Sequence, residues 1–394
     1  ANFIAVNGAK NQQVWPCFCA LECVLCNLHN HNHKGAHASV QLFPILFGVS
    51  CGKMCAVNNA ICGVFMELND RFLTQFLSGE YRLEPMQSGM SFRTYDRVHT
   101  EKSSYVVMNV PVGQQLEDGQ TAVSGVIRPF LKVHKYLQGL NIPVPQVLQV
   151  DESLGKILLE DLGEDTFYDI YAQNPISLTE YEKAVDHLVA LYKAQPLEGV
   201  EHYNTQLATI RGDFFLEDYL PAVTGVESTD VQKEHLHSIL KEIYEVVAGV
   251  KWGTILWDYH SPNLMPHDGQ VAVLDFQDAK HGPLSYDLAS LLYDARFPFA
   301  KTQRDFLFNY FVKCAGLEDI QAFRDSFEMA GLLRNLGVLG RFARSYYRDG
   351  RAEFLPKIAV LWPYMEEALQ NPCASKLKQF LDLHMPENKL LAVS

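Results

Sequence analysis

The feature that most constrains this chain is a set of three polar side chains in the stretch 254–278. Asp258 follows an apolar pair, Asn263 comes five residues later, and Asp275 comes twelve residues after that. The run Val271–Leu274 directly before Asp275 predicts a short buried strand. An ordinary turn rich in Asp and Asn would account for Asp258 and Asn263 alone, because short motifs often match by chance. The strand that leads into Asp275 makes a functional site the better interpretation.

The three residue types suit a magnesium site beside a reacting hydroxyl group. Mg²⁺ takes oxygen ligands, keeps several waters and needs few protein groups. Asn263 and Asp275 can each supply one oxygen, which leaves Asp258 off the metal and able to orient an attacking hydroxyl. His267-Asp268-Gly269 predicts a hairpin turn before the strand.

Three stretches resemble the aminoglycoside phosphotransferase-like kinases: Asp258-Tyr-His-Ser-Pro-Asn-Leu-Met, Leu274-Asp-Phe-Gln-Asp and Gly282-Pro-Leu-Ser-Tyr-Asp-Leu. The Asp-Phe-Gln-Asp form, with Gln277 where protein kinases carry Gly, is similar to that of the bacterial anomeric sugar kinases. Those enzymes phosphorylate N-acetylmuramate and N-acetylglucosamine at carbon 1 in cell-wall recycling. Stretches 158–163 and 334–350 agree with this resemblance, which covers about residues 66–369.

The resemblance implies an α+β, two-lobed, protein-kinase-like fold with a small β-rich N-lobe and a larger helical C-lobe. We expect the N-lobe over residues 66–160 and the C-lobe, with its catalytic and metal loops, over residues 161–394. ATP in the cleft would be the phosphoryl donor, and Mg²⁺ would bind Asn263 and Asp275. Asp258 would accept or orient the proton of the anomeric hydroxyl of the sugar.

Residues 1–65 differ from the rest of the chain. They carry a net charge of +2, from three lysines and one glutamate, whereas the whole chain carries −13. They also hold seven of the nine cysteines and four closely spaced histidines. Zinc favours such ligands, but the spacing fits no standard finger. The alternatives are a structural extension and, the reading we favour, a tail or a segment foreign to the native protein, which would then start at Met66.

A Ser/Gly turn near residue 90 is the candidate phosphate-binding loop. Ser88, Gly89 and Ser91 lie between two β-rich runs, and such small residues let backbone N–H groups approach phosphate oxygens. An ordinary hairpin would explain the turn equally well from these residues alone. The family carries a similar Ser-Phe-Arg-x-Tyr segment at this place, which favours nucleotide contact.

The strand lysine that pairs with ATP phosphates in most kinases has no counterpart in the segment Val106-Val-Met108. The anomeric sugar kinases resemble this chain in that respect, and Arg93 or Arg97 could supply the charge. Glu160 and Leu162 fall at the interlobe hinge that the resemblance implies, where backbone groups bind adenine. Glu160 could also be a solvated turn residue.

Acceptor contacts are expected from two segments of the C-lobe. Asp213 and Glu217 lie in a stretch of aromatic and acidic residues where similar kinases bind their acceptor, although a solvated acidic helix face is an equal alternative. Arg334 and Arg341 lie on the helix that resembles the anomeric sugar kinases, and an arginine can pair with a carboxylate such as the lactyl group of N-acetylmuramate. Asp287 resembles the family residue that supports the catalytic loop, or else caps a helix.

The composition limits the partners. A net charge of −13 argues against nucleic acid, and no apolar run is long enough to span a membrane. We expect a soluble, cytoplasmic enzyme whose partner is a small amino sugar. The alternatives are a kinase of aminoglycosides or other small alcohols, and a nucleotide-binding pseudokinase. The pseudokinase draws support from the missing lysine and from Leu256-Trp257, which stand where similar kinases have His-Arg.

Overall fold

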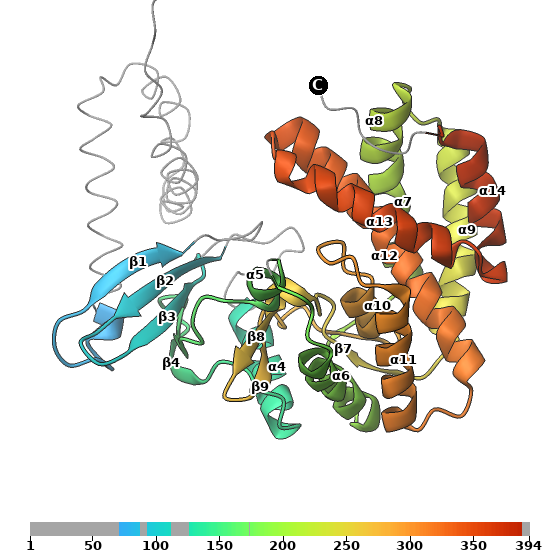
Figure 1. The fold of residues 1–394 in the computed structure, drawn as a ribbon. Helices are drawn as coiled ribbons and strands as arrows, with labels where there is room; N and C mark the ends of the chain where they lie inside the picture. The colour runs from blue at the N-terminus through green and yellow to red at the C-terminus, as the bar shows by residue number, and fades with distance from the viewer. Residues whose placement is uncertain (1–70, 87–92, 112–125, 173, 388–394) are drawn as a thin grey trace, which may run out of the picture. The chain divides into compact units, whose positions relative to one another are not determined.

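A computed structural model describes residues 71–86, 93–111, 126–172 and 174–387 (Figure 1). The chain divides into two compact units. The first contains residues 1–129 and 146–161, and the second contains residues 130–145 and 162–394. The predicted N-lobe ended at residue 160, whereas residues 130–145 group with the second unit.

The first unit contains a five-stranded antiparallel sheet in the order β1-β2-β3-β5-β4. Its strands are β1 (Arg82–Met86), β2 (Thr94–His99), β3 (Ser104–Asn109), β4 (Val147–Asp151) and β5 (Lys156–Glu160). Phe72 and Leu73 pack with Val98, Val107 and Leu158 from three of these strands, because alternate side chains of a strand share one face.

The second unit is mainly helical. Its longer helices are α4 (Arg128–Gly139, mostly in this unit), α6 (Leu178–Lys193), α7 (Thr205–Phe214), α9 (Asp230–Ala248), α11 (Lys301–Ala315), α12 (Ile320–Asp349), α13 (Leu355–Ala368) and α14 (Ser375–His384). Short helical elements are α5 (Phe167–Tyr171), η2 (Phe215–Tyr219), α8 (Leu220–Thr224), η3 (Ser261–Asn263), α10 (Tyr286–Leu292), η4 (Ala352–Phe354) and η5 (Pro372–Ala374). A β-rich unit and a larger helical unit confirm the expected α+β fold class.

Two small sheets carry the central motif of the second unit. One has the order β6-β10-β7, formed by β6 (Glu201–His202), β7 (Trp252–Ile255) and β10 (Lys280–Pro283). The other is the hairpin of β8 (Leu264–His267) and β9 (Gln270–Val273). Asp268 and Gly269 at its turn both have positive φ, 48° and 73°, as a two-residue type I′ turn requires. The predicted hairpin is therefore confirmed.

Several local sequence signals are visible in the helices. Ser177 caps α6, its side chain accepting the N–H of Glu180, and the apolar face of α6 is buried. Helix α12 packs against α7, α9 and α13 (Figure 1). It approaches α7 closely at Gly340, where an added Cβ would lie 2.1 Å from the backbone oxygen of Phe214. In the parts of the chain that the structure describes, no helix is both long and apolar enough to cross a membrane.

Candidate active site

Asp258 lies just after β7, in a loop that is held through its backbone. The N–H groups of Leu256 and Trp257 donate to the two carboxylate oxygens of Asp287 at 2.5 and 3.1 Å. Asp287 is buried in the first turn of α10. Burial raises the pKa of Asp287 to about 7, against the effect of these two hydrogen bonds. The side chain of Asp287 thus connects α10 to the two residues before Asp258.

Two residues beside this loop have an unusual backbone. Trp257 has φ of 73° and Asp275 has φ of 52°, in the left-handed region. For residues other than glycine such a conformation costs about 1–3 kcal/mol and is found mainly where the surrounding contacts enforce it. The two residues lie on either side of the β8–β9 hairpin: Trp257 directly precedes Asp258, and Asp275 follows β9.

The hairpin explains how Asn263 and Asp275 come together. Leu264 pairs with Val273 across the hairpin, and the N–H of Leu274 donates to the backbone oxygen of Asn263 at 2.8 Å. Asn263 and Asp275 are therefore neighbours at its open end. The Asn263 side-chain nitrogen donates to the backbone oxygen of Asp258 at 2.9 Å, so its amide oxygen is the atom suited to a cation.

The donor set fits Mg²⁺. Asn263 and Asp275 supply oxygen atoms, which this hard cation prefers. Gln277 donates from Nε2 to Asp275 at 2.9 Å and to Asp278 at 2.8 Å, which orients the Asp275 carboxylate. Among the described residues, no group of three or more His, Cys, Asp or Glu side chains could hold a metal ion. Further ligands would therefore have to come from phosphate oxygens and water.

Charges of both signs act on Asp258. Desolvation by burial raises the pKa of its carboxyl group most strongly, and Asp275 and Asp278 add to that effect. The guanidinium groups of Arg334 and Arg341 oppose it. The structure therefore brings both predicted arginines into electrostatic range of Asp258. Their effect favours the ionised carboxylate that a proton acceptor needs.

Arg334 is only 6% exposed, yet it has no close acidic partner among the described residues. Its one described hydrogen bond runs from Nη1 to Asn335 Oδ1 at 3.5 Å, at the limit of such contacts. Burial lowers the pKa of Arg334, while Tyr286, Asp294 and Asp258 act against that. A buried cation without a close counter-ion is costly, and it is suited to an anionic ligand.

A second support of the loop comes from Asp294. This buried carboxylate accepts hydrogen bonds from the backbone and hydroxyl of Ser261 and pairs with Arg296 at 3.0 Å. Although burial opposes it, the Arg296 cation and the other positive groups nearby hold the pKa of Asp294 well below its usual value. The ionised carboxylate of Asp294 therefore fixes the loop between Asp258 and Asn263.

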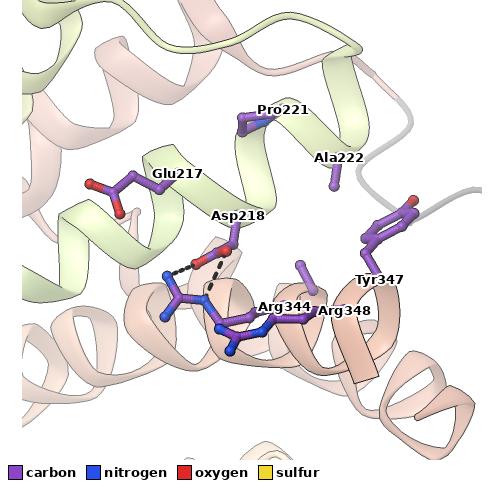
Figure 2. Close-up of a pocket in the computed structure, with 8 residues that line it drawn as sticks. Glu217, Asp218, Pro221, Ala222, Arg344, Tyr347 and Arg348 are labelled. Carbon is purple, nitrogen blue, oxygen red and sulfur yellow. Dashed lines mark hydrogen bonds and ion pairs between the residues drawn. The ribbon is translucent and has the colours of Figure 1, made fainter. Parts of the chain in front are cut away.

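Asp213 and Glu217 pair with α9 instead of gathering at Asp258. Lys233 Nζ lies 3.0 Å from Asp213 and 3.2 Å from Glu217, and His237 lies 2.8 Å from Asp213. Glu217 also borders an open cavity of about 630 Å³ between η2–α8 and α12 (Figure 2). The other residues lining it are Asp218, Pro221, Ala222, Ala343, Arg344, Tyr347 and Arg348. These contacts favour the alternative of a solvated acidic helix face.

Three of the predicted nucleotide residues, Arg93, Glu160 and Leu162, are among those that the structure describes. Ser88, Gly89 and Ser91 fall outside the described residues. Arg93 is buried, and the side chain of Arg97, the other arginine considered there, lies 2.8 Å from Asp161.

The other two predicted nucleotide residues stand on either side of the division between the units. Glu160 ends β5 and accepts the N–H of Gln146 at 3.1 Å. Leu162 begins the second part of the helical unit.

Sequence reasoning missed several residues around Asp258. Arg211 donates to the Tyr286 hydroxyl at 2.5 Å, although 75 residues separate the two. The rings of Tyr286 and Trp257 are stacked, with centroids 4.9 Å apart. Only Trp257 carried a signal, because it departs from the His-Arg pattern of similar kinases. Spacing alone could not have joined Arg211 to this loop.

The chain is similar to known phosphotransferases and sugar kinases. The sequence model of the phosphotransferase enzyme family matches residues 82–324. The N-acetylmuramate/N-acetylglucosamine kinase of Pseudomonas aeruginosa is 31% identical over 76% of this chain and 87% of its own length. The enzyme of the same name from Neisseria meningitidis serogroup B is 30% identical over 76% of this chain and 89% of its own.

One solved structure supports the fold alone. The GDP complex of wild-type aminoglycoside 2′-phosphotransferase-IIIa matches with a TM-score of 0.53 and 15% identity. It covers 77% of this chain and 98% of that chain.

Proposed function

The chain belongs to the phosphotransferase enzyme family, and we propose that it is an ATP-dependent kinase of amino sugars. It transfers the γ-phosphoryl group of ATP to the anomeric hydroxyl of N-acetylmuramate or N-acetylglucosamine. The observation that carries the proposal is the arrangement of Asp258, Asn263 and Asp275 on one loop and hairpin, next to two arginines that act on Asp258. The two relatives compared above are named for this activity, and the match covers most of their length.

Asp258 is the proton acceptor in this proposal. The anomeric O–H gives its proton to the carboxylate, the oxygen forms a bond to the γ-phosphorus, and the bond from that phosphorus to the ADP oxygen breaks. Arg334 and Arg341 favour the ionised form of Asp258 against its burial. Activity should therefore fall at acid pH, as Asp258 takes up a proton.

Asn263 and Asp275 would hold Mg²⁺, with Gln277 and the backbone of Asp258 orienting them. Bound there, the ion would neutralise charge on the phosphate oxygens. For ATP itself we retain Arg93, Glu160 and Leu162 as proposed contacts. Asp213 and Glu217 are left out, because their ion pairs with α9 already account for them.

We propose that the preferred acceptor is the one that carries a carboxylate. N-acetylmuramate differs from N-acetylglucosamine by a lactyl group, whose carboxylate can pair with a guanidinium through two parallel hydrogen bonds. Arg334 is buried near Asp258 without a close counter-ion, and Arg341 lies two helical turns further along α12. An acceptor with several positive charges would meet these arginines unfavourably.

A direct assay tests the proposal. ATP turnover should be measured with N-acetylmuramate, N-acetylglucosamine and kanamycin at one magnesium concentration, and the product position determined by phosphorus NMR. We expect phosphorylation at carbon 1 of both sugars, and poor turnover of kanamycin. The highest kcat/KM on kanamycin would overturn the sugar assignment. Binding of ATP without turnover of any of these acceptors would favour the pseudokinase alternative.

A further inference from the structure

The residue before Asp258 lies in a cluster of aromatic and cationic side chains, here called the Trp257 cluster: Trp257, Tyr286, Arg211 and Lys280. The Trp257 and Tyr286 rings are nearly parallel, at 6°, with centroids 4.9 Å apart. The guanidinium carbon of Arg211 lies 5.0 Å from the Trp257 centroid and 5.7 Å from that of Tyr286. Lys280 Nζ lies 5.1 Å from the Trp257 centroid.

Each member of the cluster is fixed from a different part of the fold. Arg211 comes from α7, is 6% exposed and donates to the Tyr286 hydroxyl. An added Cβ at Gly337 of α12 would lie 3.1 Å from the Arg211 side chain, so the two helices hold Arg211 tightly. Lys280 comes from β10, pairs in register with Ile255 of β7 and forms an ion pair with Glu201.

The backbone at Trp257 explains why such a cluster is needed. Its φ of 73° is unfavourable for a bulky side chain. The carboxylate of Asp287 accepts the backbone N–H groups of Leu256 and Trp257, which fixes the backbone but not the indole ring. Stacking and cation–π contacts hold the ring itself. The orientation of the next residue, Asp258, therefore depends both on the hydrogen bonds to Asp287 and on the contacts of the Trp257 ring.

We propose that the Trp257 cluster positions Asp258 for proton transfer, in place of the His-Arg pair that similar kinases have before this aspartate. Arg211, Trp257 and Tyr286 are positioning residues, and they act through the backbone of residue 257. The inference rests on the proposed function for its kinetic test, since Asp258 is the proton acceptor there. It also removes one argument for a pseudokinase, because the altered pair has a structural role of its own.

The test compares Arg211→Gln, Trp257→Gly and Trp257→Phe with the parent chain. We expect Arg211→Gln and Trp257→Gly to lower kcat about tenfold to a hundredfold, with KM for ATP and sugar within about threefold, because a misplaced base slows the reaction step more than it weakens binding. Trp257→Phe keeps an aromatic ring over Arg211 and should retain most of the activity. Glycine relieves the backbone at this position, so a loss with glycine and a rescue with phenylalanine would assign the effect to the ring.

Arg324→Gln is the matched control. Arg324 makes the same kind of contact in the same unit, 3.9 Å from the Phe308 centroid, and has no described contact with the cluster. It should lower the melting temperature without changing kcat. If Arg211→Gln behaves like this control, or raises KM for the sugar at unchanged kcat, the positioning role is wrong.

A spectroscopic measurement separates this inference from the proposed function. The near-ultraviolet circular dichroism of the stacked Trp257 should disappear in Trp257→Phe and change in Arg211→Gln, whichever acceptor the enzyme uses. Absence of sugar phosphorylation by the parent chain would reject the proposed function. An Arg211→Gln spectrum identical to that of the parent would reject the cluster.

Discussion

Buried cations differ in their hydrogen-bond partners between the β-rich unit and the surroundings of Asp258. In the β-rich unit, Lys156 is 4% exposed and donates to Asn109 at 2.5 Å, and Asn109 donates in turn to Asp96 at 2.7 Å. Around Asp258, Arg334 is equally buried, yet its one described hydrogen bond is 3.5 Å long. Proteins rarely bury a charge without a close partner unless it serves a function.

The difference in partners depends on whether a buried cation lies near Asp258, and not on the unit that contains it. Arg304, also in the helical unit, is 5% exposed and pairs with Glu367. Arg211 donates to a neutral phenol and lies over two rings, with no carboxylate partner among the described residues. Cations that the fold uses for its own stability thus have acidic or amide partners. The cations near Asp258 instead have N–H donors suited to a bound molecule, as at Arg334, or contact the aromatic residues beside the loop, as at Arg211.

The largest expected effect tests the carboxylate that these arginines act on. Asp258→Asn should lower kcat by about 10²–10⁴-fold, because a general base typically contributes that much. Binding of ATP should stay within about threefold, since Asp258 is not a proposed metal ligand. Stopped-time assays and ATP titration by calorimetry would measure both. Turnover within threefold of the parent would remove Asp258 from this role.

The next prediction tests the internally paired cation. Burial lowers the pKa of Lys156 to about 8. Between pH 8 and 10.5 the unfolded chain therefore binds more protons than the folded one, so the parent gains stability as pH rises. From a normal value of 10.5, the gain is about 3 kcal/mol at most. Lys156→Met should lack this gain and keep its activity.

Urea unfolding at pH 7, 8.5 and 10 would measure the difference between Lys156→Met and the parent. Lys102→Met, at an exposed position of the same unit, controls for the loss of one positive charge. A parallel pH dependence of Lys156→Met and the parent would show that Lys156 is not the titrating group. A tenfold loss of kcat in Lys156→Met would break the comparison, because the paired cation would then be functional.

The third prediction concerns Arg334. Arg334→Gln should lower kcat/KM for N-acetylmuramate about tenfold to a hundredfold, the range expected for one charged hydrogen-bonded pair of about 1.5–3 kcal/mol. The value for N-acetylglucosamine, which lacks the carboxylate, should change less than about threefold. An equal loss on both sugars would mean that Arg334 acts only through Asp258 or the transferred phosphoryl group and does not bind the carboxylate of the acceptor.

The parts of the fold predicted from sequence are those with local signals. The strand before Asp275 and the Asp268-Gly269 turn each depend on residues a few positions apart, and the structure has both. The sheet of β6, β7 and β10 was not predicted. Its strands are two to four residues long, and β6 lies far from its partner in the sequence.

The candidate site divides in the same way. The nearness of Asn263 to Asp275 could be read from spacing, because one hairpin brings them together, and Asn263 bonds to the backbone of Asp258 five residues earlier. The contact of Arg211 with Trp257 could not, since it depends on how α7 packs against α12. The acidic pattern at Asp213 was ambiguous, because its partner Lys233 comes from another helix.

The smallest expected effect comes from Arg344, one helical turn beyond Arg341 on α12. Arg344 pairs with Asp218 at 2.9 and 2.8 Å on the rim of the open cavity (Figure 2), and its side chain is 36% exposed. Exposed ion pairs contribute about 0–1 kcal/mol, so Arg344→Ala should change stability by no more than that. The kcat/KM of Arg344→Ala on both sugars should stay within about twofold of the parent, because the guanidinium of Arg344 is already paired with Asp218. If Arg344→Ala weakens N-acetylmuramate turnover as strongly as Arg334→Gln, then burial without a counter-ion does not distinguish the functional arginines of α12. The carboxylate would then have to be placed at the open cavity instead of beside Asp258.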